Sequence, residues 1–153
     1  MRFGPKNLTF LPEQGTVFVR LVNSKPVRPT SAPVRVLIAD DHRLFGQALE
    51  AVLTADERIK VVGYAHDGRE AVELERELDP DVTLMDISMP VMDGIEATRA
   101  IREVKPSARV LMLTGSNSRA DVDRARDAGA AAYVTKDRIA SELIETIIET
   151  ASR

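Results

Sequence analysis

Five short runs of mostly apolar residues follow one another along the chain after residue 33. They are VRVLIA (34–39), IKVVGYA (59–65), DVTLMD (81–86), RVLMLT (109–114) and AAYVTK (131–136). A continuous apolar run of this length is typical of a strand that is covered on both faces. The pattern therefore predicts five buried β-strands.

The segments between these runs have apolar residues three or four positions apart, the spacing of one helix face. These residues are Leu44, Ala48, Leu49, Val52, Leu53, Ala71, Leu74, Leu78, Ile95, Thr98, Ile101, Ile139, Leu143, Ile144, Ile147 and Ile148. Segment 118–128, SRADVDRARDA, has Val122 as its single large apolar residue, so we expect it to be the most loosely held helix. The alternation of strands and helices predicts one α/β domain over residues 34–153, with a parallel sheet and right-handed crossovers.

The first 33 residues differ in composition from the rest. They carry five basic residues and one acidic residue, a net +4; because the whole chain carries −3, the other 120 residues carry −7. The segment NSKPVRPTSAP (23–33) is typical of a linker, and TVFVRLV (16–22) is a candidate short strand with no obvious partner. We expect most of residues 1–33 to be disordered, or to form an extension without a function of its own; a basic arm is the alternative.

Composition excludes several classes of protein. The chain of 153 residues has no cysteine, which excludes disulfides and thiolate chemistry, and its two histidines, His42 and His66, argue against a zinc site. No apolar run approaches the roughly 20 residues that span a bilayer, and MRFGPKNLTF at the start lacks the apolar block of a secretory signal. We therefore expect a cytoplasmic protein with no membrane partner. The acidic part, 34–153, argues against direct contact with nucleic acid.

Polar residues stand at the ends of four of the predicted strands. Asp40 and Asp41 follow the first strand, Asp86 ends the third, Thr114 ends the fourth and Lys136 ends the fifth. The carboxyl ends of parallel strands lie along one edge of the sheet, so these side chains face one crevice if the first and third strands are neighbours.

Three carboxylates at one edge require a cation. Each close pair repels by roughly 4 kcal/mol at an effective dielectric constant of 20. Mg²⁺ suits such a site better than zinc or calcium, because it takes octahedral oxygen ligands and is commonly held by one or two carboxylates together with a phosphoryl group. Phosphoryl transfer would then use the carboxylate of Asp86, the charge of Lys136 and the hydroxyl of Thr114.

The segments LIADDH (37–42), LMDISMPVMDG (84–94), LMLT (111–114) and AAYVTK (131–136) together resemble the receiver domain of two-component response regulators. The resemblance covers residues 34 to about 150. It implies a flavodoxin-like (βα)5 fold, in which a doubly wound parallel sheet of five strands has the order 2-1-3-4-5. This family is a standard example of that strand order.

The resemblance also implies roles for the residues at the sheet edge. Asp86 would be the phosphoacceptor, and the donor would be a phosphohistidine on a sensor histidine kinase or phosphotransfer protein. Mg²⁺, with Mn²⁺ as a possible substitute, would be held directly by Asp41 and Asp86, through water by Asp40, and by the backbone carbonyl of Ser88.

Three further residues would stabilise and report the phosphoryl group, by the same resemblance. Lys136 would pair with the acyl phosphate, and Thr114 would move its hydroxyl onto a phosphoryl oxygen. Tyr133 would rotate inward as the coupled switch. Gly115 stands where alanine is commoner in the family, which affects access to the phosphoryl group.

DDH (40–42), YAHDGREAV (64–72) and Asp137, where most receivers have proline, resemble the branch that carries a C-terminal LuxR-type helix-turn-helix. The chain stops at Arg153 without a recognition helix, so we expect either an excised receiver, whose output domain regulates transcription, or a receiver that works alone. Asp137 is a good N-cap for the final helix.

Each of these residues has an ordinary explanation when it is taken alone. An Asp-Asp pair after a strand is commonly a turn and a helix cap, and Lys136 would be a solvated charge. Their joint placement on one edge is what favours phosphoryl chemistry. We interpret His42 as a structural residue near a helix start, and His66 as a loop residue.

We therefore predict a phosphoacceptor switch that catalyses its own phosphoryl uptake and slow hydrolysis, without being a turnover enzyme. The alternative is a stand-alone or phosphorylation-independent binding module. A nucleotide- or flavin-binding enzyme is disfavoured, because neither G-x-G-x-x-G nor G-x-x-x-x-G-K-[ST] occurs.

Phosphorylation is expected to bias a two-state equilibrium, with helix 118–128 and strand 131–135 as the moving face. The final helix has two apolar rows, 139/143/147 and 144/148, which is more than one core face requires. We therefore predict a homodimer through the helices near 43–54 and 139–150.

Overall fold

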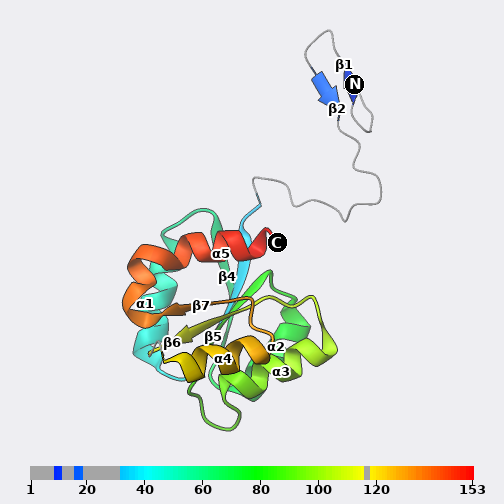
Figure 1. Ribbon diagram of the computed structural model, residues 1–153. Helices are drawn as coiled ribbons and strands as arrows, with labels where there is room; N and C mark the ends of the chain where they lie inside the picture. Colours follow the sequence, from blue (N-terminus) through cyan, green and yellow to red (C-terminus); the bar gives the residue numbers. More distant parts are fainter. Residues whose placement is uncertain (1–8, 12–15, 19–31, 116–117) are drawn as a thin grey trace. The chain divides into compact units, whose positions relative to one another are not determined.

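The computed structural model describes residues 9–11, 16–18, 32–115 and 118–153, and the chain divides into two units, the second of which is Pro33–Arg153 (Figure 1). In the first unit, β1 (Thr9–Leu11) pairs antiparallel with β2 (Thr16–Phe18). Residues 16–18 of the candidate strand at 16–22 therefore have a partner, which the sequence pattern did not indicate because TFL is too short to show a period; residues 19–22 lie outside the described residues. The disorder expected elsewhere in residues 1–33 lies outside the described residues.

The second unit is built on one parallel sheet, whose strands confirm the five apolar runs to within one residue at each end. They are β3 (Val34–Ala39), β4 (Ile59–Ala65), β5 (Val82–Asp86), β6 (Val110–Thr114) and β7 (Ala132–Thr135). Their spatial order is β4-β3-β5-β6-β7, with every pair parallel. Counted within this unit, that is the expected order 2-1-3-4-5, with β5 in the middle and β3 beside it.

Five α-helices cover the two faces of this sheet. They are α1 (Arg43–Thr54), α2 (Gly68–Leu78), α3 (Gly94–Val104), α4 (Arg119–Asp127) and α5 (Ile144–Ala151). Helices α1 and α5 lie on one face, and α2, α3 and α4 lie on the other (Figure 1). Each face buries its own apolar cluster, one with Leu49, Leu53 and Ile147, the other with Ile95 and Ile101.

Three helices on the second face begin at a capping side chain. Asp67 accepts a hydrogen bond from the backbone N–H of Glu70 at the start of α2, and the Ser118 hydroxyl accepts one from the backbone N–H of Asp121 at the start of α4. Asp93 forms a reciprocal capping box with Glu96 at the start of α3. A cap of this kind contributes about 1 kcal/mol. The loops at the carboxyl edge of the sheet therefore end at defined residues.

The final helix begins differently from the prediction. After β7 the chain forms a 3₁₀ turn, Lys136–Arg138, and a π-helical turn, Ile139–Leu143, before α5. Asp137 lies inside the 3₁₀ turn, and no capping side chain is found at either turn or at α5 among the described residues. The prediction of Asp137 as an N-cap was wrong, because an N-cap needs extended backbone and the chain already turns at Lys136.

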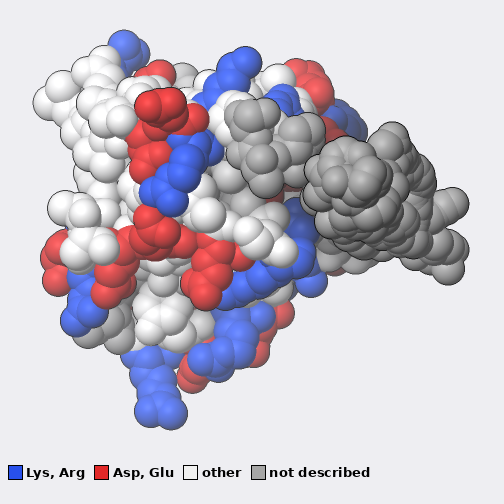
Figure 2. Space-filling view, turned by 90° about the horizontal axis from the view of Figure 1, so that it is seen from above, with Lys and Arg blue, Asp and Glu red and all other residues white. Residues whose placement is uncertain are grey.

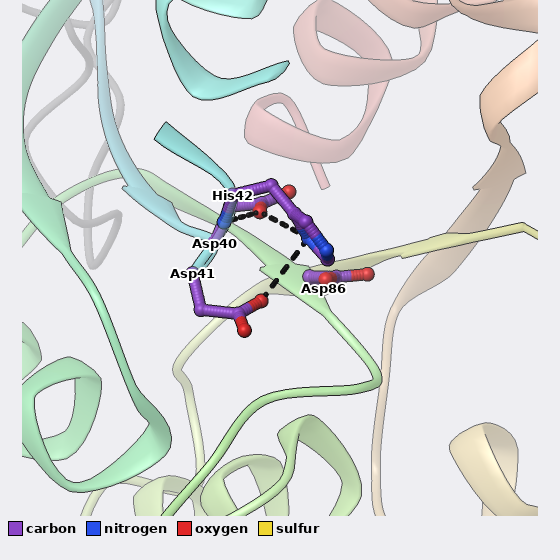
Figure 3. A group of neighbouring side chains, drawn as sticks. All are labelled: Asp40, Asp41, His42 and Asp86. Carbon is purple, nitrogen blue, oxygen red and sulfur yellow. Dashed lines mark hydrogen bonds and ion pairs between the residues drawn. The ribbon is translucent and has the colours of Figure 1, made fainter. Parts of the chain in front are cut away.

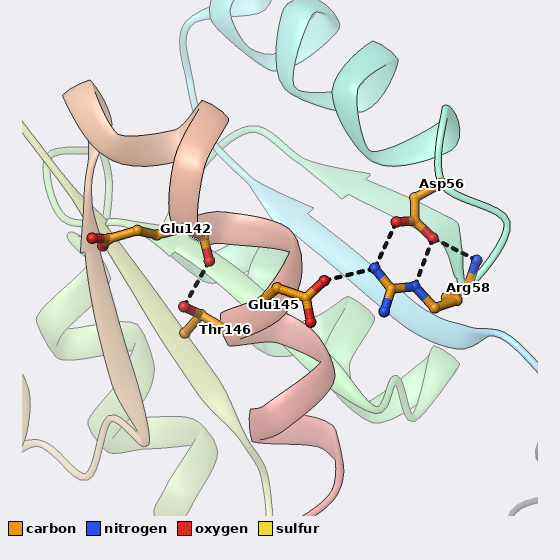
Figure 4. A network of polar contacts seen from close by, with 5 residues as sticks. All are labelled: Asp56, Arg58, Glu142, Glu145 and Thr146. Atoms are coloured by element: carbon orange, nitrogen blue, oxygen red, sulfur yellow. Dashed lines mark hydrogen bonds and ion pairs between the residues drawn. The ribbon is translucent and has the colours of Figure 1, made fainter.

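A polar network joins the α1–β4 turn to α5 (Figure 4). Arg58 Nη2 is 2.9 Å from Asp56 Oδ2 and 2.8 Å from Glu145 Oε2. The hydrogen bonds from Arg58 lower the pKa of Asp56 to about 2. Thr146 Oγ1 donates a hydrogen bond to the backbone carbonyl of Glu142 within the π-to-α segment. The network is exposed, so it orients α5 more than it stabilises the fold.

Basic and acidic side chains are interspersed on the face of the molecule shown in Figure 2, rather than separated into areas of one sign. Within the described ranges, none of the helices combines the length and the apolar character needed to cross a membrane.

Candidate functional site

Asp86 is the last residue of β5, the central strand of the sheet, and is only 3% exposed. The glycine of the MDG segment allows the following loop to fold back on it. A Cβ on Gly94 would lie 2.1 Å from the carbonyl oxygen of Asp86, and the N–H of Gly94 donates to the carbonyl of Ile87 at 2.7 Å. The start of α3 therefore packs directly against the backbone of Asp86, which only glycine permits.

The carboxylates of Asp40 and Asp41 meet that of Asp86, because β3 is the neighbour of β5 (Figure 3). Asp40 is fully buried, and its Oδ1 accepts a hydrogen bond of 2.7 Å from the backbone N–H of His42. One ligand atom from each of these three aspartates and from His42 lies within 4.8 Å of all the others. The structure thus brings together the three acids that the sequence placed on separate strand ends.

Lys136 reaches the same cluster from the end of β7. Its Nζ is 3.2 Å from Asp86 Oδ1 and 3.8 Å from Asp40 Oδ2, and it lies 4.3 Å from the centre of the Phe45 ring. The aromatic ring and the two carboxylates both favour the ammonium in this position. The lysine thus provides a positive charge beside Asp86.

The other expected residues take different positions. Thr114 ends β6 as a buried residue, one position beyond Leu113, the register partner of Asp86. Ser88 lines an open groove of about 540 Å³ together with Asp41. Tyr133 is 45% exposed and lines a different hollow, of about 780 Å³.

The electrostatics of the site favour a cation. Burial raises the pKa of Asp86 above its ordinary value, the charge of Asp40 adds to this, and Lys136 opposes it. The buried oxygens Asp40 Oδ2 and Asp86 Oδ2 accept no hydrogen bond from any described residue. A buried carboxylate oxygen that accepts no hydrogen bond is costly, and a hard divalent ion bound by oxygen would satisfy both. The residues present therefore fit Mg²⁺.

His42, interpreted from the sequence as a structural residue near a helix start, is the N-cap residue of α1 and also lies in the acidic cluster, where it was not expected. Its Nδ1 lies 3.2 Å from Asp41 Oδ1 and 3.4 Å from Asp40 Oδ1. Its side chain makes no capping hydrogen bond to α1 within the described part of the chain. The sequence feature that could have indicated this position is that His42 directly follows the two aspartates. A short turn there keeps consecutive side chains close to one another.

This arrangement suits phosphoryl chemistry. A carboxylate that can act as nucleophile lies beside two further acids that can share a divalent ion with it, and an ammonium lies on its other side. Phosphoryl transfer depends chiefly on such positioning and on cations that stabilise the equatorial oxygens.

Comparisons of sequence agree with this geometry. The model of the response regulator receiver domain family matches residues 36–148. The response regulator protein VraR of Staphylococcus saprophyticus is 38% identical over 118 residues, which is 77% of this chain and 56% of that protein. The transcriptional regulatory protein LnrK of Bacillus subtilis is 36% identical over 119 residues, 78% of this chain and 54% of that protein. The chain thus spans about half the length of these curated relatives.

Solved structures show the same fold. The receiver domain of the NarL response regulator from Mycobacterium tuberculosis superposes with a TM-score of 0.76 at 36% identity, covering 79% of this chain and 98% of that one. A LuxR-family response regulator from Aurantimonas has a TM-score of 0.76 at 35% identity, covering 79% and 86%. Since the family match extends from β3 into α5, and LuxR-type regulators are among its relatives, this chain belongs to the response regulator receiver family, whose domains take part in phosphorelay signalling with histidine kinases or phosphotransfer proteins.

Proposed function

We propose that this chain accepts a phosphoryl group on Asp86 from the phosphohistidine of a sensor histidine kinase or phosphotransfer protein. An oxygen of Asp86 forms the new bond to phosphorus while the P–N bond of the donor breaks, and its electron pair returns to the donor imidazole. The observation that carries the proposal is the buried carboxylate of Asp86 with Lys136 at 3.2 Å and two further acids beside it. This is self-catalysed uptake and hydrolysis, and the domain is not a turnover enzyme.

The metal of this reaction would be Mg²⁺, with Mn²⁺ as a substitute. Asp41 and Asp86 would bind it directly, Asp40 through water, and Ser88 through its backbone carbonyl. When bound, the ion neutralises charge that develops on the phosphoryl oxygens. The buried oxygens of Asp40 and Asp86 that accept no hydrogen bond from the described residues support this assignment.

The remaining residues would hold and report the phosphoryl group. Lys136, already beside Asp86, would pair with a phosphoryl oxygen, and Thr114 would donate its hydroxyl to another. Tyr133, now exposed, would turn inward as Thr114 moves toward the phosphoryl group. A shift from about 1% to 99% of the active form requires about 5.5 kcal/mol of differential stabilisation, which several charge-assisted hydrogen bonds can supply.

Phosphoryl uptake tests this function directly. The wild-type chain is incubated with acetyl phosphate and Mg²⁺ and its intact mass is measured; we expect a gain of one phosphoryl group that EDTA prevents. Asp86→Asn should abolish the gain, whereas Asp123→Asn, at a partly exposed aspartate of α4, should keep it. Wild-type protein without any gain would favour the alternative, a phosphorylation-independent binding module.

We further propose that residues 34–153 form the receiver, that 1–33 are an extension, and that the phosphorylated receiver acts through an output domain beyond this chain. LnrK and DegU are named as transcriptional regulatory proteins, which supports control of transcription by a LuxR-type domain. A protein-glutamate methylesterase of Photobacterium profundum also matches at 45% identity over 26% of its length. Receivers of this similarity are thus attached to more than one kind of output.

A homodimer through α1 and α5 is the remaining proposal. On α1, Leu44 is 79% exposed and Val52 is 41% exposed. On α5, Ile144 and Ile148 are only partly buried by the core beside them. Apolar side chains left in water on two helices of one face are typical of an interface.

Sedimentation velocity tests the dimer. We expect the wild-type chain with a beryllofluoride phosphate analogue to sediment as a dimer and Val52→Asp to sediment as a monomer. The control is Val104→Asp, which changes an exposed valine of α3 and should leave the dimer intact. A wild-type chain that stays monomeric with and without the analogue would rule the interface out.

A further inference from the structure

The side chain of His42 is turned toward the acidic cluster and not away from it (Figure 3). Its Nδ1 is 3.2 Å from Asp41 Oδ1 and 3.4 Å from Asp40 Oδ1, and a ring nitrogen lies within 4.8 Å of a carboxylate oxygen of Asp86 as well. Bonds of about 2.0–2.2 Å to one ion bring its ligand atoms within a little over 4 Å of one another. A small movement of these side chains would therefore place all four on a single ion.

Two features make this more than an ordinary ion pair. Asp40 Oδ2 and Asp86 Oδ2 are buried and accept no hydrogen bond from the described residues, so the cluster contains acceptors that the imidazole at Oδ1 does not satisfy. The side chain of His42 is 65% exposed and lines the open groove that leads to Asp41. An ion can reach this cluster from solvent, and the buried oxygens provide a reason for it to bind.

The type of donor atom decides which ions such a site prefers. An all-oxygen site suits Mg²⁺, which shows little preference for imidazole. A nitrogen ligand added to the carboxylates favours the later divalent ions of the first transition row, in the order Mn²⁺, Co²⁺, Ni²⁺. His42 thus changes the selectivity of the site without being needed for Mg²⁺.

We propose that His42 is a metal ligand, and that with Asp40, Asp41 and Asp86 it forms a mixed oxygen and nitrogen centre that binds Co²⁺ or Ni²⁺ in competition with Mg²⁺. The inference rests on the metal site of the proposed function and adds a ligand and a class of ion to it. Its consequence is that transition ions and Mg²⁺ exclude each other from the phosphoacceptor.

Calorimetric titration of the full chain with NiCl₂ and, separately, MgCl₂ at one fixed pH tests the selectivity. His42→Asn should lower the affinity for Ni²⁺ by about tenfold or more, the size of effect seen when groups around a metal are removed. It should change the affinity for Mg²⁺ by less than about threefold. The control is His66→Asn, which removes the other histidine, also 3.2 Å from a carboxylate, and should leave both affinities unchanged.

A spectroscopic measurement separates ligation from a structural role. With one equivalent of Co²⁺, the proton NMR spectrum should contain hyperfine-shifted imidazole signals that are lost in His42→Asn and kept in His66→Asn. Equal weakening of Ni²⁺ and Mg²⁺ by His42→Asn, or Co²⁺ spectra without shifted imidazole signals in the wild-type chain, would overturn the inference.

The result can be told apart from failure of the proposed function. If the chain takes up a phosphoryl group with Mg²⁺ but binds Ni²⁺ equally well in the wild type and in His42→Asn, this inference is wrong and the proposed function stands. Ni²⁺ binding that depends on His42, without phosphoryl uptake, would support the inference and defeat only the proposed function.

Discussion

At the scale of single residues, Asp86 is a compromise between stability and chemistry. Its carboxylate lies in the centre of the sheet edge, where burial and the charge of Asp40 raise its pKa. One unit of such a shift corresponds to about 1.4 kcal/mol of difference between the charged and neutral forms. Lys136 offsets part of this cost, and the rest is the energetic reason that the site would bind a divalent ion.

Asp86→Asn should therefore stabilise the metal-free protein. We expect urea denaturation at pH 7 to show a free energy of unfolding higher by about 1–2 kcal/mol than in the wild type, because a buried charge and its repulsion from Asp40 are removed. Mg²⁺ should reduce this difference in the free energy of unfolding, because it stabilises the wild type more than the variant, which lacks the Asp86 carboxylate as a ligand. Asp123→Asn, which changes a partly exposed aspartate of α4, should have little effect.

The same carboxylate sets a pH dependence. Because the pKa of Asp86 is higher in the folded than in the unfolded protein, the folded state binds more protons between the two values, and stability falls as pH rises through that window. Urea denaturation of the wild type from pH 4 to 8 should show this fall, about pH 4 being the ordinary carboxyl value. In Asp86→Asn the free energy of unfolding should fall less with pH than in the wild type. If it falls equally steeply in both, the pH dependence does not come from Asp86.

At the scale of elements, the loop from β5 to α3 combines strain with tight anchoring. Val91 has a φ of 70°, and the N–H of Met92 donates to the carbonyl of Pro90 at 2.7 Å, which closes a γ-turn around it. A β-branched residue pays about 1–3 kcal/mol for this region of backbone space. Two backbone hydrogen bonds fix the loop in place. The N–H of Gly68 donates to the carbonyl of Met92 at 3.0 Å, and the N–H of Gly94 donates to the carbonyl of Ile87.

Val91→Gly should raise the free energy of unfolding by about 1 kcal/mol. Glycine relieves the strained φ, and little packing is lost because Val91 is 71% exposed; the greater entropy of unfolded glycine offsets only part of the gain. Thermal or urea denaturation measures the change. Val104→Gly, at an equally exposed valine with ordinary helical backbone, should not raise stability, and a stabilised control would show that the effect does not come from strain.

At the scale of the whole molecule, the second face of the sheet is held unevenly. Helix α3 buries five residues, and α4 buries Ala125 alone among its described residues. This agrees with the expectation, from the single large apolar residue Val122, that α4 packs loosely. Because little apolar area holds α4, it is the element that a phosphoryl group at Asp86 can displace at least cost.

Hydrogen exchange measured by mass spectrometry should show this unevenness. We expect the amides of α4 to exchange faster than those of α3, and exchange over residues 118–135 to change when the beryllofluoride analogue binds with Mg²⁺. The Asp86→Asn variant should show no response to the analogue. Exchange that stays the same over 118–135 while changing elsewhere would place the moving face on another part of the fold.

The local pattern of residues was sufficient to predict the secondary structure and the chemistry of the strand ends. Buried parallel strands need apolar residues on both faces and helices need them on one, so local pattern alone located all five strands and the α-helices of the second unit. The spacing of the aspartates and Lys136 also predicted a phosphoryl site, because parallel strands present their carboxyl ends along one edge.

The folded structure was needed to show how closely those groups approach and which way their side chains turn. The apolar pattern did not give the order of the strands, which the resemblance to receivers implied and the structure confirms; β3 beside β5 brings Asp40 and Asp41 to Asp86 from far along the chain. The direction of a side chain depends on the backbone around it and on neighbours from other elements, so His42 turned into the site, Tyr133 remained nearly half exposed, and Asp137 entered a 3₁₀ turn in place of capping a helix. A linear pattern reports which residues are buried, and it contains no information about which of them face one another.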